Sequence, residues 1–149
     1  IGPGNHYCSV IPNLLVPGIP EAIRESQAKV VYNGNLVSKR WHTDEFTLED
    51  YVEAIDRLLG GSRIDYATYN TRLPSEDLLM KYAHESVLTG RRSDRRTIGD
   101  RCTVIEGDFL DARPVKYSRA DKIAATRAFI RHDTEKLSRV LMTLVKESE

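Results

Sequence analysis

The sequence predicts an α/β fold with a mainly parallel sheet and flanking helices. Segments with strand character alternate along the chain with segments of helical periodicity, which is the pattern of α/β layering. Asn35 and Asn70 each stand at the end of a strand segment, and the carboxyl ends of parallel strands line one crevice. A chain of 149 residues is the usual size of one domain, so we expect a single core.

Composition argues against several classes of protein. Hydrophobic residues make up 40% of the chain and charged residues 30%, which is typical of a folded soluble domain. The formal net charge is zero, so no overall field attracts nucleic acid or an anionic membrane. No apolar stretch is long enough to span a bilayer, and the isolated Cys8 and Cys102 suggest neither a disulfide framework nor a metal site. We therefore expect a cytoplasmic protein with no membrane span, no nucleic-acid partner and no metal site.

The first third of the chain predicts two short helices and a strand. Residues Ser9–Val16 and Pro20–Ser26 are the helices, and Pro17-Gly18 separates them. Pro20 suits the first helical position because its missing N–H has no partner there. Residues Ala28–Asn35 then form the first strand.

A helix over Thr47–Leu59 follows. Thr47 and Asp50 resemble a capping box, and Gly60-Gly61 ends the helix. Apolar residues at 3.6-residue spacing predict one buried stripe, made of Leu48, Tyr51, Val52, Ile55, Leu58 and Leu59.

The rest of the chain predicts two more strands and two more helices. Ile64–Asn70 and Cys102–Glu106 are the strands. Between them, Ser75 to about Glu85 is an amphipathic helix with Leu78, Leu79 and Tyr82 inward. After a variable stretch at 120–127, Asp133 caps a last helix. Its expected stripe comprises Leu137, Val140, Leu141, Leu144 and Val145.

An anion site is predicted near the start of the chain, where residues 2–9 read GPGNHYCS. Glycines let the backbone approach a ligand closely, and the start of the following helix offers N–H groups and a positive dipole end to a phosphate. Gly2, Pro3, Gly4 and Asn5 are therefore candidate phosphate-binding residues. Gly-Pro-Gly is also an ordinary turn, so the motif alone leaves both interpretations open.

Two further groups of polar residues complete the candidate site. The amides of Asn35 and Asn70 can donate and accept, which suits a base, a ribose or a sugar hydroxyl, although asparagine is also a turn former. In the RHD segment, Arg131 can grip a phosphate, His132 can carry a proton, and Asp133 is expected to cap the helix. We expect these loops to converge with the first one along one edge of the sheet.

A basic run offers a different interpretation. Its members are Arg91, Arg92, Arg95, Arg96 and Arg101. Asp94 and Asp100 dilute the charge, so a solvated loop is favoured over a nucleic-acid patch. A protein-interaction module that uses this loop, without a small ligand, remains an alternative.

Residues 2–26, GPGNHYCSVIPNLLVPGIPEAIRES, resemble the GPGSxYTSxxPNLLxPGIxEAI stretch of the YvcK-like proteins, which are relatives of the CofD phospholactate transferases. The resemblance continues more thinly through KVVYNGNL, DYVEAI, IDYATYNTRLP and RHDTEKL, and so spans nearly the whole chain. The terminal RHD and its helix are similar to the YvcK-like branch rather than to CofD.

The resemblance implies a Rossmann-like sheet and a nucleotide-type small molecule as ligand. YvcK-like proteins bind UDP-sugars and support carbon metabolism and cell-wall growth, so a UDP-sugar-binding regulatory protein is the leading hypothesis. CofD enzymes transfer a phospholactyl group from a guanosine diphosphate donor to a deazaflavin using magnesium, which is the alternative. Whether the chain is an enzyme and whether it forms a homo-oligomer stay open.

The chain departs from the family pattern within residues 5–8, in the loop at 39–43 and at Tyr51, where a histidine is usual. Asn5, His6 and Cys8 stand where serine, leucine and threonine are usual. KRWHT at 39–43 replaces a QPGET-like loop, and Thr43 at its end is a candidate ligand-binding residue. Trp41 in place of a glycine and His42 in place of a glutamate should alter the shape and charge of the pocket.

The chain opens at Ile1 with no methionine, and the family's amino-terminal glycine-rich phosphate loop is absent. We therefore expect residues 1–149 to be a single unit, the carboxy-terminal part of a CofD-like/YvcK-like domain. Such a unit would hold only the later part of the crevice.

Overall fold

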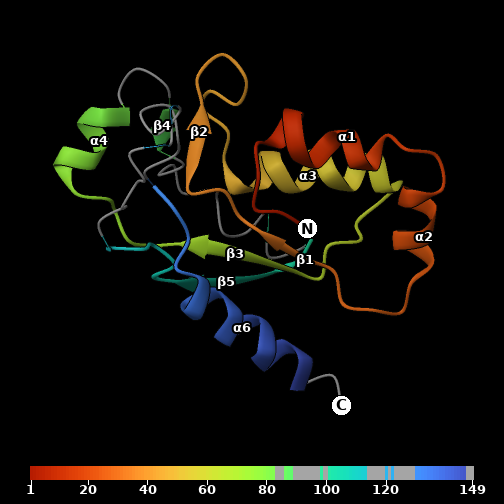
Figure 1. Ribbon diagram of the computed structural model, residues 1–149. Coiled ribbons are helices and arrows are strands. Elements are labelled where there is room, and N and C mark those ends of the chain that lie inside the picture. Colours follow the sequence, from red (N-terminus) through yellow and green to blue (C-terminus); the bar gives the residue numbers. More distant parts are fainter. Residues whose placement is uncertain are drawn as a thin grey trace.

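The computed structural model describes residues 1–82, 86–88, 98, 101–113, 120, 122 and 130–146. Within them, a parallel sheet contains β1 (Val31–Asn33), β3 (Tyr66–Asn70) and β5 (Thr103–Gly107), in the order β1-β3-β5. Asn33 is in register with Thr68, and Asn70 with Gly107. The three strands therefore run in one direction and end at one edge of the sheet, as the sequence predicts (Figure 1).

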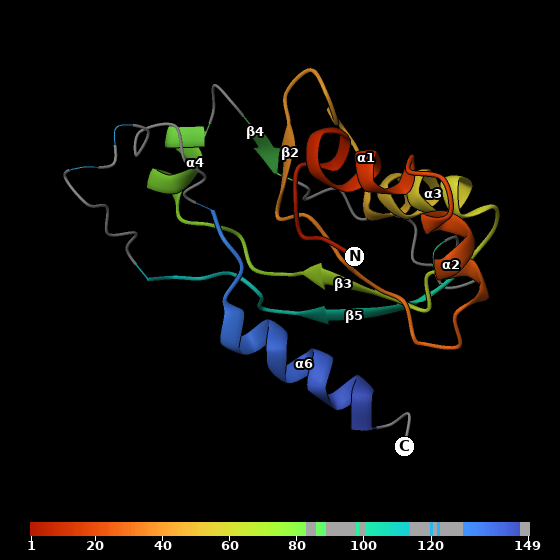
Figure 2. The ribbon, with the colours of Figure 1, turned by 45° about the vertical axis from the view of Figure 1, so that its right-hand side comes forward.

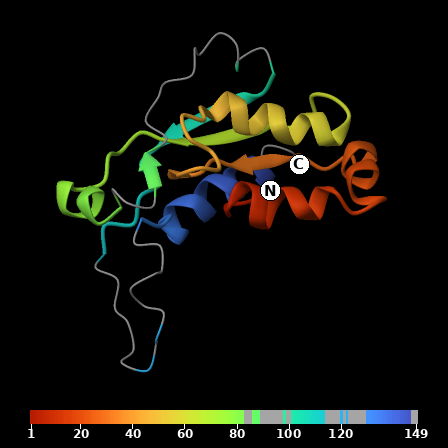
Figure 3. The same cartoon turned by 90° about the horizontal axis from the view of Figure 1, so that it is seen from above.

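Helices cover both faces of this sheet. One face carries η1 (His6–Val10), which continues into α1 (Ile11–Leu14), together with α2 (Ile19–Glu25) and α3 (Leu48–Leu59). The opposite face carries α6 (Thr134–Lys146) (Figures 1 and 2). Seen from above, α1 and α3 lie side by side, and the two are in contact (Figure 3). This three-layer arrangement confirms the predicted Rossmann-like class.

Helix α3 matches its sequence prediction closely. The Thr47 hydroxyl accepts the Asp50 N–H at 3.3 Å, and the Asp50 carboxylate accepts the Thr47 N–H at 2.6 Å, so the capping box is formed. Gly60 ends the helix with a φ of 80°. The stripe packs into the main core, with Leu58 only partly buried and the other five members buried: Leu48, Tyr51, Val52, Ile55 and Leu59.

Other elements differ from the predictions at their ends. The amino-terminal helix starts at His6 rather than Ser9, because the Asn5 side chain caps it by accepting the Cys8 N–H at 3.2 Å. Strand β1 is shorter than the predicted Ala28–Asn35, since only Val31–Asn33 pair with β3. Helix α4 (Glu76–Tyr82) covers the described part of the predicted Ser75–Glu85.

The stripe predicted for the last helix is wider than the face that α6 buries. Leu137 and Leu144 are buried, whereas 53% of Val145 is exposed. The two buried leucines lie seven residues apart, two turns along one side of the helix. Val145 is rotated by about 100° from Leu144, which turns it away from the sheet.

A second, antiparallel pair was not predicted. Strand β2 (Val37–Lys39) pairs with β4 (Ser86–Leu88), with Val37 opposite Leu88. Beneath this pair a small cluster buries Leu36, Leu110 and Ile130. Most of the basic run and of the variable stretch at 120–127 lies outside the described residues. No helix in the described part of the chain has the length and apolar character that a membrane span requires.

Candidate functional site

The Gly2–Asn5 loop leaves the sheet at its carboxyl edge. The amino group of Ile1 donates to the Val31 carbonyl at 2.7 Å, and the Ile1 carbonyl accepts the Asn33 N–H at 2.9 Å. These two bonds have the pattern of a parallel ladder, with Ile1 beside Tyr32. Gly2 therefore leaves the sheet beside the end of β1, with a φ of 66°. Asn5 then begins the η1–α1 helical segment.

Asn35 joins this loop to the end of β1. Its Nδ2 donates to the Gly4 carbonyl at 3.0 Å, and its Oδ1 accepts the Tyr32 hydroxyl at 3.0 Å. The structure thus brings together two of the segments that the sequence analysis singled out. The Asn35 amide holds the carbonyl of a glycine in the predicted anion loop, so the positions of the two segments depend on each other.

The backbone of Gly34 links β1 to the third candidate segment, which contains His132. Its N–H donates to the Thr68 hydroxyl of β3 at 3.1 Å, and its carbonyl lies 3.1 Å from His132 Nε2. Because the carbonyl can only accept, His132 donates from Nε2. Burial lowers the pKa of His132, and the bond to Gly34 partly offsets that effect. A neutral imidazole protonated on Nε2 is therefore the favoured form at neutral pH.

The RHD segment is held against the turn after β5. Asp111 N–H donates to the Arg131 carbonyl at 2.9 Å, and Asp133 N–H donates to the Phe109 carbonyl at 2.7 Å. Asp133 also caps α6, because its Oδ1 accepts the N–H groups of Glu135 at 3.0 Å and Lys136 at 3.1 Å. The predicted capping role is confirmed, and the Arg131 side chain lies on the exposed side of this segment.

Asn70 lies at the same edge, but its amide is engaged by the backbone. Oδ1 accepts the Phe109 N–H at 2.9 Å, and Nδ2 donates to the Arg72 carbonyl at 2.6 Å. The side chain thereby fastens the turns after β3 and β5 to each other. These bonds favour the turn-forming interpretation of Asn70, and its role in ligand binding stays a prediction.

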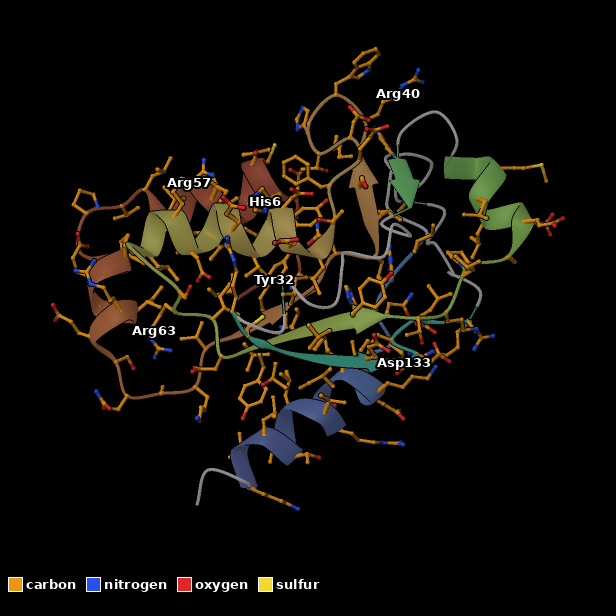
Figure 4. All side chains as sticks on the ribbon, turned by 180° about the vertical axis from the view of Figure 1, so that it is seen from behind. His6, Tyr32, Arg40, Arg57, Arg63 and Asp133 are labelled. Carbon is orange, nitrogen blue, oxygen red and sulfur yellow. The ribbon has the colours of Figure 1, made fainter. Side chains whose placement is uncertain are left out.

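Thr43 stabilises the loop between β2 and α3. Its hydroxyl accepts the Lys39 N–H at 2.8 Å, and its side chain is buried. At the tip of the loop, Trp41 is 83% exposed and has a φ of 68°. In Figure 4, Arg40 on this loop lies at the top of the view, well above Asp133, which precedes α6. Thr43 is thus built into a separate loop, and no bond described in the structure links it to Gly4 or Asn35.

A charged cluster that the sequence analysis missed completes the edge. Asp108, directly after β5, accepts Lys136 Nζ at 2.7 Å and Arg72 Nη1 at 3.0 Å. The bond from Lys136, aided by Arg72, lowers the pKa of Asp108 to about 2. Two cations beside one carboxylate leave the cluster with a net positive charge. An acidic residue two positions after the predicted strand Cys102–Glu106 was the available sequence signal.

The described residues also bear on metal binding. No group of three or more His, Cys, Asp or Glu side chains among them is arranged to hold a metal ion. Asp108, the carboxylate directly after β5, is instead paired with Arg72 and Lys136.

The fold is that of Rossmann-like α/β proteins, in which ligands bind beyond the carboxyl ends of parallel strands. The chain belongs to the family described as 2-phospho-L-lactate transferase CofD, whose family model matches residues 1–110.

Relatives of known sequence are similar over much of this chain. The gluconeogenesis factor of Bacillus subtilis is 31% identical over 99% of this chain and 42% of its own length. A relative from Aquifex aeolicus is 32% identical over 98% of this chain and 40% of its own length. The gluconeogenesis factor of Halalkalibacterium halodurans is 42% identical over 57% of this chain and 26% of its own length. The chain thus spans less than half the length of these relatives.

The same fold occurs in a solved structure. The crystal structure of a UPF0052 family member from Bacillus halodurans matches with a TM-score of 0.76 and 30% identity. The match covers 95% of this chain and 41% of that one.

Proposed function

We propose that this chain forms part of the site of a UDP-sugar-binding regulatory protein of the gluconeogenesis-factor type, linked to carbon metabolism and cell-wall growth. One observation carries the proposal. The turn Gly34-Asn35 bonds the Gly4 carbonyl through one residue and His132 through the other, so three candidate segments meet at the carboxyl edge. The relatives named gluconeogenesis factors support the link to carbon metabolism.

The phosphates of such a ligand would lie by the Gly2–Asn5 loop. The nine-residue helical segment His6–Leu14 starts there, and its amino-terminal end attracts negative charge. Arg131 carries a fork of donors suited to phosphate oxygens, and the net positive charge of the Asp108 cluster adds to the attraction. The chain has no net charge overall, so this local arrangement has to provide the selectivity for an anion.

The proposal also concerns the place of this chain in a longer protein and the cellular location of that protein. Because the chain matches less than half the length of its relatives, we propose that residues 1–149 are the carboxy-terminal part of a longer CofD-like domain. Both cysteines are free thiols, which fits the reducing cytoplasm.

Binding is tested with the intact protein and UDP-N-acetylglucosamine. A ligand that binds only the folded state raises the unfolding temperature, so we expect a shift that grows with ligand concentration. Asn35→Ala removes the bond to Gly4 and should weaken binding about tenfold, as measured by calorimetry. Asn13→Ala is the matched control, because the Asn13 side chain lies on an exposed helix surface and donates to the Ser9 carbonyl. No stabilisation by any nucleotide-sugar would contradict the proposal.

The family match favours one second candidate, a phospholactate-type transferase. Such an enzyme needs magnesium, and the described residues do not fit that ion, because Asp108 is already paired with Lys136 and Arg72. Incubation with a guanosine diphosphate donor, a deazaflavin and magnesium separates the two functions. We expect no release of GMP, and its release would establish the transferase instead.

A further inference from the structure

Tyr32 lies close to Gly2 of the Gly2–Asn5 loop and is linked to Gly4 through Asn35. The residue is fully buried in β1, and its hydroxyl lies 3.0 Å from Asn35 Oδ1. A β-carbon placed on Gly2 would lie 3.6 Å from Cε2 of the Tyr32 ring, so the ring supports the start of the loop. Through Asn35 the hydroxyl supports the carbonyl of Gly4. One buried side chain therefore underlies the whole predicted anion loop.

The directions of these hydrogen bonds follow from the chemistry of the groups. The Gly4 carbonyl can only accept, so the amide nitrogen of Asn35 has to face it. The amide oxygen of Asn35 then faces Tyr32, whose hydroxyl has to donate. Burial raises the pKa of Tyr32, which keeps the phenol protonated and able to donate. Tyr32 thus stabilises the same orientation of the Asn35 amide that the Gly4 carbonyl requires.

The orientation of Asn35 fixes a backbone group of the loop. In a trans peptide the C=O and the following N–H point in opposite directions. With the Gly4 carbonyl turned toward Asn35, the N–H of Asn5 points away from Asn35. Without the Tyr32 hydroxyl, the Asn35 amide loses one of the bonds that hold it in this orientation, so the Gly4–Asn5 peptide is held less firmly.

We propose that Tyr32 is a positioning residue of the nucleotide-sugar site, acting through Asn35 to hold the Gly4–Asn5 peptide in the orientation that receives a phosphate. This inference rests on the proposed function. It assigns a ligand-related role to a side chain in the core that does not itself touch the ligand.

Tyr32→Phe in the intact protein tests the inference, with Tyr51→Phe as the matched control. Tyr51 is equally buried, and its hydroxyl lies beside Thr43 and Ser38 rather than Asn35. We expect Tyr32→Phe to weaken UDP-N-acetylglucosamine binding about fivefold, and Tyr51→Phe to change it less than twofold. In an Asn35→Ala background, Tyr32→Phe should cause no further loss, because its route to the loop is already removed. Additive losses, or equal losses in the two phenylalanine variants, would overturn the inference.

A ligand-free measurement separates this inference from the proposed function. Hydrogen exchange at the Cys8 and Ser9 amides, which both bond Asn5, should become faster in Tyr32→Phe but not in Tyr51→Phe, while exchange at Ala67 in β3 stays unchanged. If the wild-type protein binds no nucleotide-sugar, the proposed function fails, and exchange alone decides whether Tyr32 orients the loop. Unchanged exchange at Cys8 and Ser9 in Tyr32→Phe would refute that role.

Discussion

Replacing Gly34 with alanine should destabilise the fold more than most single substitutions at glycine. A β-carbon on Gly34 would press into the carbonyl oxygen of Thr68 and lie 3.1 Å from Cδ1 of Leu48. Thr68 belongs to β3, which is hydrogen-bonded to β1 on one side and β5 on the other. Its backbone therefore cannot retreat without loss of sheet bonds.

The magnitude follows from this geometry. Overpacking in a core typically costs about 1–3 kcal/mol, and a contact with fixed backbone belongs at the upper end. Moving Gly34 aside would also strain its bonds to Thr68 and His132. We therefore expect a loss of about 3 kcal/mol, which in a protein of this size lowers the unfolding temperature by about 6–12 °C.

Urea unfolding followed by circular dichroism measures this loss, with Gly4→Ala as the comparison. A β-carbon on Gly4 would meet only side chains, Cβ of Ser9 at 3.3 Å and Cγ2 of Val10 at 3.5 Å. The short helix can adjust to that contact, so we expect a change within about 1 kcal/mol. Equal urea midpoints for the two variants would show that the close approach of Gly34 to β3 does not limit stability.

Three further predictions concern the helix cap, acid stability and the charged cluster. Asp133→Ala should cost about 1 kcal/mol in urea unfolding, and Asp133→Ser should recover most of it; equal losses would exclude capping as the cause. Burial lowers the pKa of His6 from 6.5, so the folded state binds fewer protons than the unfolded state and stability falls as the pH drops below that value. His6→Leu should reduce this fall in the free energy of unfolding. If the variant and the wild type show the same pH dependence, groups other than His6 cause the fall. Lys136→Met should raise the pKa of Asp108 from about 2 toward 3.8 in an NMR titration. The ion pair between Asp108 and Lys136 stabilises the fold by less than about 1 kcal/mol, because it is partly exposed. This stabilisation is present above pH 3.8 and is lost as the pH falls toward 2.

Helix α3 could be predicted in detail because its local signals agree. The cap at Thr47, the apolar spacing and the stop at Gly60 all indicate the same helix, and the structure contains each of them. The β2–β4 pair could not be predicted, because three-residue strands carry no readable alternation. The pairing of Val37 with Leu88 also depends on how the intervening chain packs.

In the candidate site, too, some contacts could be predicted from the sequence, whereas others depend on how distant segments pack. The meeting of Gly4 and Asn35 follows from the rule that parallel strands end at one edge. That the amide of Asn70 is engaged by Arg72 and Phe109 depends on the relative placement of two turns, which one sequence does not reveal. The support that Tyr32 gives to Asn35 was equally hidden, because a tyrosine in a strand indicates only burial.

The contact between Gly34 and His132 has a consequence for biosynthesis. It joins residues 98 positions apart, whereas the contact between Gly34 and Thr68 spans only 34. The chain emerges from the ribosome amino terminus first, so β1 and β3 can pair long before His132 has been made. Closure of this edge must therefore be a late event in folding, and a chain released early would keep the paired strands while lacking the imidazole.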